Sequence, residues 1–421
     1  SQVASARTLT VSNLATTTFS GPVFLASGTA NGSGLNINGT GNVVISGAVS
    51  DNTSSGTGST LTYAGSGILS LNGTNAYRGT TTLSGQGGTL MLGSASALGA
   101  SSNVVVSATG ATLDFNGQNY TTAISITTLA GRLTNSSTTA AVYAGDVATS
   151  STALINGVGD ITLNGNVSGN TFFVKDGSNT LTLGGTANNT SLSLTLNNGV
   201  VVLNKTNTTA IRTGAVINGG ELRLAGTGGN QILNSSGVTV NSGTFNVNSQ
   251  NETVASLQVG TGSTSGIIIG STGTLASTAT IDARSGSVSA ILDGTAGLTK
   301  TTAATVTLSG SNVYTGATTV SAGTLIINGT GVSAVTVNAG VLGGSGVIGN
   351  SVTINSGGTL APGNSPGILS TGNLTLSGSG AVMSMELGKA ISGSQPVAGT
   401  DYDQINVTGT VDLTGGDLSL T

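Results

Sequence analysis

The sequence predicts an all-β protein, a parallel β-solenoid of roughly 20 coils with no significant helix. A short element, Gly-x-Φ-x-Φ with Φ apolar, returns along the chain, and the gaps between neighbouring copies include 22, 21, 23, 17 and 18 residues. A period near 20 in a Gly-rich chain is typical of a stacked solenoid, in which each period forms one coil. The element starts at Gly88, Gly110, Gly199, Gly220, Gly243, Gly323, Gly340, Gly358 and Gly416.

Short strands are expected along the whole chain, because apolar and polar residues alternate with a period of two between Gly, Asn and Ser turns. No window carries the spacing of an amphipathic helix. An array of β-sandwiches is the alternative, but the regular period favours the solenoid. The expected strands include Thr8–Val11, Val43–Ile45, Val104–Val106, Ile161–Leu163, Leu181–Leu183, Val238–Val240, Phe245–Val247 and Val352–Ile354.

Composition narrows the possible functions. Of the 421 residues, 69 are Gly and only 6% are charged, with no His, Cys or Trp and a net charge of −4. The scattered Lys and Arg form no basic patch, so we expect no nucleic-acid partner. No apolar run reaches the length of a membrane-spanning helix, so we expect no membrane insertion by this segment. The absence of Cys removes disulfides and thiol chemistry, and nothing indicates a cofactor or a metal.

One continuous solenoid over residues 1–421 is predicted, with longer modules nested in it at about 64–116, 174–226 and 299–369 and C-terminal coils over 370–421. Leu69–Leu83 aligns without gaps to Val306–Val320, sharing an Asn-x-Tyr-x-Gly segment. A weaker third copy begins at Lys175, as Lys300 begins the copy before Val306, but it loses the Asn-x-Tyr-x-Gly part.

Residues 308–325 and the segment Gly358–Gly367, which reads Gly-Thr-Leu-Ala-Pro-Gly-Asn-Ser-Pro-Gly, resemble the passenger-associated repeat of bacterial autotransporters. The resemblance is strong over about 299–421, moderate over 64–116 and only compositional elsewhere. It implies an exported right-handed parallel β-helix at the bacterial cell surface or outside the cell. The sequence departs from that family because no C-terminal membrane barrel is visible in it.

Enzymes with this fold need acidic side chains gathered on one face, and here fourteen acids are spread over 421 residues. The best pairs are Asp401 with Asp403, Asp412 with Asp417, and Glu221 with Arg223. An exposed ion pair is the expected role of Glu221 and Arg223. Asp401 and Asp403 could bind calcium, but a structural role is favoured. We therefore expect no catalytic, cofactor-binding or metal-binding residue.

Three further patterns carry weak functional signals. A Ser or Thr nucleophile would lack a base, because the chain has no His and few Lys, and a Ser–Lys arrangement is the alternative that stays open. The glycines of 343–349 superficially resemble a phosphate loop, yet no helix follows them. Threonine runs at 16–18, 80–82 and 318–319 suggest ice binding, which would need a flat ladder of Thr-x-Thr at one coil position. These runs do not keep a single phase, so ice binding is disfavoured.

The function that the sequence predicts is structural, an extracellular rod at the bacterial surface that assembles with itself end to end into fibres or a matrix. Both Leu9–Val11 and Leu418–Leu420 look like ordinary coil strands, and an exposed strand edge templates pairing with another chain. The alternative is an adhesin for host or abiotic surfaces, with cell-surface or glycan ligands bound on inserted loops at 117–160 or 261–300. A polysaccharide-degrading enzyme is the remote alternative.

Overall fold

The computed structural model describes residues 6–25, 32–51, 57–169, 172–227, 230–388 and 395–421. These residues form strands, turns and bends without a helix, and every pairing between their strands is parallel. The chain divides into two compact units, residues 1–213 with 225–231 and residues 214–224 with 232–421. The prediction of a parallel β-solenoid is therefore confirmed, while its right-handed sense and its continuity over 1–421 stay predictions.

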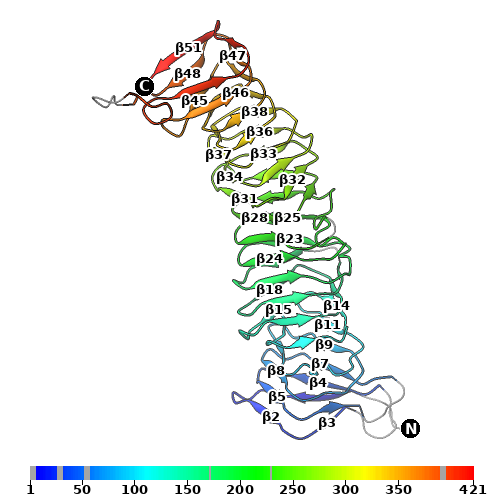
Figure 1. Cartoon of the computed structure of the whole chain (residues 1–421). Coiled ribbons are helices and arrows are strands. Elements are labelled where there is room, and N and C mark those ends of the chain that lie inside the picture. The colour runs from blue at the N-terminus through cyan, green and yellow to red at the C-terminus, as the bar shows by residue number, and fades with distance from the viewer. Residues whose placement is uncertain (1–5, 26–31, 52–56, 170–171, 228–229, 389–394) are drawn as a thin grey trace. The chain divides into compact units, whose positions relative to one another are not determined.

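In the first unit three ladders of strands, walls A, B and C, carry the turns, and Figure 1 labels many of their strands. Wall A contains β1 (Arg7–Thr10), β4 (Gly34–Asn38), β7 (Thr60–Tyr63), β9 (Thr81–Leu83), β11 (Val104–Val106), β14 (Ile126–Leu129), β17 (Val147–Thr149) and β20 (Val167–Ser168). Wall B contains β2 (Thr17–Phe19), β5 (Val43–Ile45), β8 (Ile68–Leu71), β10 (Thr89–Leu92), β12 (Thr112–Asp114), β15 (Arg132–Asn135), β18 (Ala153–Gly157), β21 (Phe172–Lys175) and β23 (Ser193–Leu196). Wall C contains β13 (Asn119–Tyr120), β16 (Ala141–Tyr143), β19 (Ile161–Leu163), β22 (Thr180–Leu183) and β24 (Val200–Leu203), and β3 (Val23–Phe24) pairs with β6 (Val49–Ser50).

The second unit repeats walls B and C and replaces wall A by two shorter ladders. Its wall B contains β25 (Gly214–Ile217), β27 (Val238–Val240), β30 (Leu257–Val259), β33 (Ile281–Ala283), β36 (Leu298–Lys300), β38 (Thr318–Val320), β41 (Val335–Val337), β44 (Val352–Asn355), β47 (Leu374–Ser377) and β50 (Val411–Asp412). Its wall C contains β26 (Glu221–Leu224), β28 (Gly243–Asn248), β31 (Gly266–Gly270), β34 (Gly286–Val288), β37 (Thr305–Leu308), β39 (Thr324–Ile327), β42 (Gly340–Gly344), β45 (Gly358–Pro362), β48 (Ala381–Met385) and β51 (Gly416–Leu420). The shorter ladders are β29 (Glu252–Val254), β32 (Thr274–Ser277) and β35 (Ile291–Asp293), and then β40 (Thr330–Gly331), β43 (Val347–Ile348), β46 (Ile368–Thr371) and β49 (Gln404–Val407).

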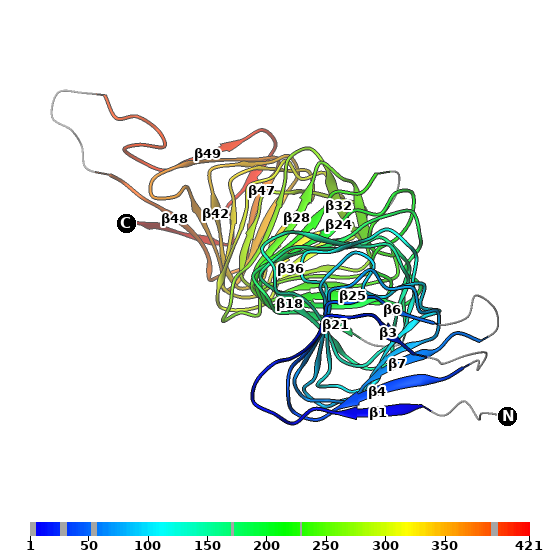
Figure 2. The same ribbon diagram turned by 90° about the horizontal axis from the view of Figure 1, so that it is seen from below.

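The number of turns is slightly lower than the roughly 20 expected. Wall C has five strands in the first unit and ten in the second, and wall B has nine and ten, which gives between 15 and 19 turns in the described residues. The strands expected from the alternating pattern are present, β5 and β11 among them with the expected bounds. Figure 2 shows β1, β4 and β7 of wall A side by side, as their pairing requires.

The core consists of inward columns of apolar side chains. Leu69, Leu90, Leu113 and Leu133 occupy the same register on four successive strands of wall B, and each is 0% exposed. Burying one such side chain stabilises the fold by roughly 1.5–3 kcal/mol. The residues between them point outward, because successive side chains of a strand lie on opposite faces. The outward positions are therefore where any ligand has to bind.

The glycine element of the sequence marks a wall strand. From Gly199 onward each copy precedes or begins a strand of wall C, whereas Gly88 and Gly110 precede strands of wall B. Gly340 has a φ of 84°, and a Cβ there would lie 2.3 Å from the carbonyl oxygen of Gly323 on the preceding turn. Only glycine fits such a corner, because both the conformation and the space exclude a side chain. The element therefore records one turn of the solenoid.

Candidate functional site

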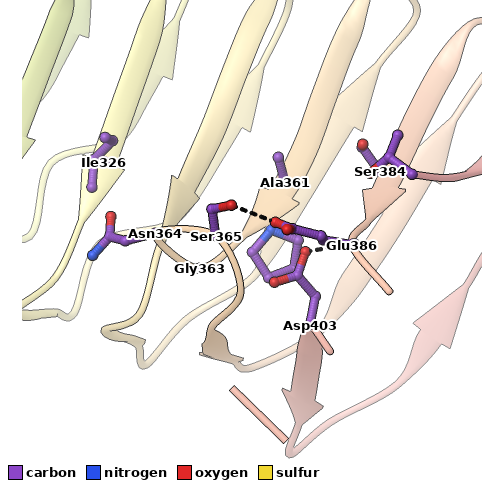
Figure 3. A pocket seen from close by; sticks show the side chains of 10 residues that line it. Ile326, Ala361, Gly363, Asn364, Ser365, Ser384, Glu386 and Asp403 are labelled. Carbon is purple, nitrogen blue, oxygen red and sulfur yellow. Dashed lines mark hydrogen bonds between the residues drawn. The ribbon is translucent and has the colours of Figure 1, made fainter. Parts of the chain in front are cut away.

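Asp403 borders a hollow of about 440 Å³ on the last turns of the second unit (Figure 3). Its carboxylate is 7% exposed and accepts two backbone hydrogen bonds, at Oδ1 from Gly367 N and at Oδ2 from Glu386 N, both at 2.8 Å. Asp403 therefore ties two chain segments together. The hollow is lined by Ile326, Ala361, Pro362, Gly363, Asn364, Ser365, Ser384, Glu386, Asp403 and Thr421.

Asp401 forms hydrogen bonds with a different part of the backbone. Its Oδ2 accepts a hydrogen bond of 2.7 Å from Val397 N, and its carbonyl oxygen accepts one from Gly388 N. The carboxylates of Asp401 and Asp403 thus hold separate backbone groups, which favours the structural role expected for this pair. No group of three or more acidic side chains able to hold a metal ion occurs within the described ranges.

Glu386 is the acidic side chain of the hollow that the sequence did not single out. Ser365 Oγ donates a hydrogen bond of 2.6 Å to its Oε2 (Figure 3). Ser365 has a φ of 77°, a strained conformation for a residue with a side chain. Both oxygens of Asp403 already accept hydrogen bonds from backbone amides. The Glu386 carboxylate can accept further hydrogen bonds from the hydroxyls of a ligand.

The other acidic candidates also form hydrogen bonds with neighbouring residues. Arg223 forms two hydrogen bonds with Glu221, at 2.9 and 2.7 Å, and Asn246 of the next turn donates to Glu221 at 2.8 Å. The hydrogen bonds from Arg223 lower the pKa of the Glu221 carboxyl. Asp412 accepts hydrogen bonds from the amide and hydroxyl of Thr414, which lower its pKa, and Asp417 is exposed on β51. The structure does not gather these acids into one site.

Three buried lysines occupy inward positions where the other turns have apolar residues. Lys175, Lys205 and Lys300 are each 0% exposed, and burial lowers the pKa of the first two to about 8. Lys205 Nζ donates to Gly165 O at 2.8 Å, and Lys300 Nζ donates to Thr302 O and to Ala322 O of the next turn. The alternating pattern of the sequence could have identified these lysines as inward, because each follows an inward apolar residue by two positions.

The contact between Lys300 and Thr302 and the glycine-rich segment 343–349 both have structural roles, and Lys389 lies outside the described residues. Lys300 Nζ lies 3.2 Å from Thr302 Oγ1, but this hydroxyl donates its proton to Arg284 O. Gly343 and Gly344 lie in β42, Gly346 and Gly349 flank β43, and a Cβ on Gly344 would come within 2.2 Å of Ile327 O. These glycines permit close stacking of turns and do not cradle a phosphate.

The expectation of inserted loops at 117–160 and 261–300 is wrong. Residues 117–160 contain β13 to β18, and residues 261–300 contain β31 to β36, all paired in parallel with neighbouring turns. In 117–160 the period is obscured because β16 lacks the glycine that opens most wall C strands, whereas in 261–300 both β31 and β34 begin with it. A ligand therefore cannot be assigned to insertions at these places.

The Asn-x-Tyr-x-Gly segments build the same buried network in both units. In the first unit Asn75 accepts from Val49 N at 2.7 Å and donates to Ala97 O, and the Tyr77 hydroxyl bonds to Thr81 Oγ1, which bonds to Ser101 Oγ.

In the second unit Asn312 accepts from Leu292 N at 3.0 Å, and Tyr314 bonds to Thr318, which bonds to Ser333. The weaker third copy keeps the asparagine, since Asn189 accepts from Val167 N and donates to Ala210 O, both at 2.8 Å. The repeated segment thus ties neighbouring turns together.

Comparison with known proteins identifies this repeated segment. The family model of the passenger-associated-transport-repeat matches residues 61–92 and 298–327. Each range contains one of the two Asn-x-Tyr-x-Gly segments. The adhesin BmaC autotransporter of Brucella suis biovar 1 (strain 1330) is 34% identical over 188 residues, which cover 41% of this chain and 5% of that protein. No solved structure matches the chain. None of the described residues form a helix that could cross a membrane.

Proposed function

We propose that this chain, which carries the passenger-associated repeats of an autotransporter, is an adhesin-like segment exposed at the bacterial cell surface. The similarity to an autotransporter adhesin carries this proposal. The outward columns of the walls carry many hydroxyl and amide side chains, as Thr319, Thr336 and Thr353 show in wall B. Such columns resist unfolding outside the cell without disulfides, since each turn is bonded to the next along its length.

The hollow beside Glu386 is the proposed ligand site. Its volume of about 440 Å³ falls in the range of small-molecule sites, and a carboxylate, hydroxyls and an amide surround an apolar floor. These groups suit a hydroxylated ligand such as a glycan. The test is binding of the purified chain to a glycan panel and to host cells. A Ser384→Tyr variant fills the hollow and should lose binding, whereas Ser287→Tyr, on an outward position of the same wall, should keep it. Equal binding by both variants would place the ligand elsewhere.

End-to-end assembly is a second candidate, supported by a separate apolar hollow of about 260 Å³ at the last described turn. Leu374, Met383, Met385, Ile405, Val407, Val411 and Leu413 line it. In the described residues β49, β50 and β51 pair in parallel with strands of the preceding turn. A turn of a second copy would extend the ladders and fill the hollow.

Assembly is tested by sedimentation and electron microscopy over a range of concentrations. Fibres or concentration-dependent oligomers are expected, and Val411→Lys should suppress them by placing a charge in the apolar hollow. Monomers alone at every concentration would rule assembly out. The same preparations serve to test for an enzyme, for which we expect no cleavage of polysaccharides, because the acidic side chains are held by local partners.

A further inference from the structure

Five threonines form an uninterrupted ladder on the outward face of wall B in the second unit. The strand register places Thr299 opposite Thr319, Thr319 opposite Thr336, Thr336 opposite Thr353, and Thr353 opposite Thr375. This is a ladder of single threonines, and not the flat Thr-x-Thr ladder that the sequence leads one to expect for ice binding. The threonine runs indeed differ in phase, because Thr81 and Thr318 point inward and are buried. The ladder instead consists of single threonines, one from each of β36, β38, β41, β44 and β47.

A second set of polar residues lies two positions after each ladder threonine. It consists of Thr301, Ser321, Asn338, Asn355 and Ser377, of which the first three follow the end of their strand. Asn355 donates a hydrogen bond of 2.7 Å to Asn338, so these two side chains bond along the stacking direction. The ladder itself repeats at about 4.8 Å along the stack, given the spacing of strands. Its hydroxyl groups therefore repeat in one dimension.

The hydroxyls of the ladder are free to bind. None of the five threonine side chains makes a hydrogen bond to another described residue, whereas Thr301 in the neighbouring column is bonded to Asp282 at 3.1 Å. A β-branched side chain has a restricted χ1 angle on a strand, so the five hydroxyl and methyl groups are held in a repeated orientation. Binding a ligand therefore costs these threonine side chains little conformational entropy.

The ladder is also uncharged. Asp282 precedes Thr299 and Asp412 follows Thr375 in the register, but no charged side chain lies in the column between them. The columns on either side hold no aromatic residue, and aromatic side chains are the groups that supply large flat contact to a ring. The ladder is a repeating, neutral column of hydroxyl and methyl groups, and it is complementary to a repeating, neutral partner. Ordered water at the surface of ice has this chemistry.

We propose that the threonine ladder from Thr299 to Thr375 binds the surface of ice. The hydroxyls would hydrogen-bond to water molecules of the lattice, and the methyl groups would lie between them. This inference rests on the register and on the unbonded hydroxyls, and it does not depend on the proposed adhesin function. A polysaccharide surface is the other partner of similar periodicity, and it is disfavoured because the face has no aromatic side chain.

The test compares the full chain with two variants by partition into a growing ice front and by inhibition of ice recrystallisation. Thr336→Tyr places a bulky side chain at the centre of the ladder, on a strand position that tolerates aromatics. Thr307→Tyr is the matched control, because Thr307 is a half-buried outward residue of wall C in the same unit. Thermal unfolding followed by circular dichroism checks that both variants fold like the wild type.

We expect the wild type and Thr307→Tyr to enter the ice and inhibit recrystallisation. Thr336→Tyr should need about tenfold more protein for the same inhibition, the loss typical of a disrupted interface centre. No inhibition by the wild type, or equal activity of the two variants, would overturn the proposal. Binding to insoluble cellulose that is lost only in Thr336→Tyr, without any effect on ice, would assign the ladder to polysaccharide and also refute it.

Discussion

Replacing Asn312 by Ala tests whether the repeated Asn-x-Tyr-x-Gly segment holds neighbouring turns together. Asn312 is 2% exposed, accepts a hydrogen bond from Leu292 N and donates one of 3.1 Å to Gly310 O. Alanine removes both bonds and leaves a buried N–H without a partner, since Leu292 is 0% exposed. A lost hydrogen bond and an unsatisfied buried group together cost about 2–4 kcal/mol.

Hydrogen exchange is the suitable assay, because it reports opening of one turn and does not require the whole chain to unfold in two states. The Leu292 amide should lose about 30- to 1000-fold of its protection in Asn312→Ala. Asn338→Ala is the control, since Asn338 is exposed and its bonds lie on the surface. The reasoning is refuted if Leu292 keeps its protection in Asn312→Ala, or if the control loses as much.

Three further outcomes follow from the contacts. Stability should rise between pH 8 and pH 9, because Lys175 and Lys205 have a pKa near 8 when folded and 10.5 when unfolded, so the unfolded chain binds more protons in that range. The slope is about 1 kcal/mol per pH unit for each lysine, and denaturation midpoints of Lys205→Met should show a smaller one. Gly340→Ala should destabilise the second unit by about 2 kcal/mol or more, because the positive φ and the carbonyl of Gly323 exclude a Cβ, whereas Gly331→Ala, which meets nothing within 4 Å, should have little effect in the same denaturation experiment. Tyr314→Phe should cost about 1 kcal/mol through the lost bond to Thr318, and an unchanged midpoint would contradict the network.

Much of the fold could be predicted because it repeats. The glycine corners and alternating residues are local signals, and each reports one turn without knowledge of the others. The site could not be predicted in this way. Asp403 holds Gly367, which lies 36 residues away, and Glu386 meets Ser365 across a turn of variable length. These contacts depend on register, and a shift of one residue would move every side chain to the other face.

The buried positions of the lysines and the register of the threonine ladder also could not be predicted from local sequence. A lysine at an inward position contradicts the apolar pattern, so composition alone suggests an exposed charge for Lys300, yet this side chain is 0% exposed and donates to carbonyl groups. The ladder threonines fit the pattern as outward residues, and nothing local distinguishes them from other threonines. Only the pairing of strands of unequal spacing, for example 17 residues from Thr336 to Thr353 and 22 from Thr353 to Thr375, places them in one column.

Low charge in this chain follows from the fold, and it is therefore poor guidance to function. Stacking puts each outward position about 4.8 Å from its counterpart on the next turn, where two like charges would repel. The charged residues that remain on the walls are paired or neighbour neutral groups, as Glu221 does between Arg223 and Asn246 and as Asp282 does beside Arg284. Functional information lies instead in departures from this rule. Glu386 is such a departure, because its carboxylate borders a hollow and accepts a hydrogen bond from the neutral Ser365.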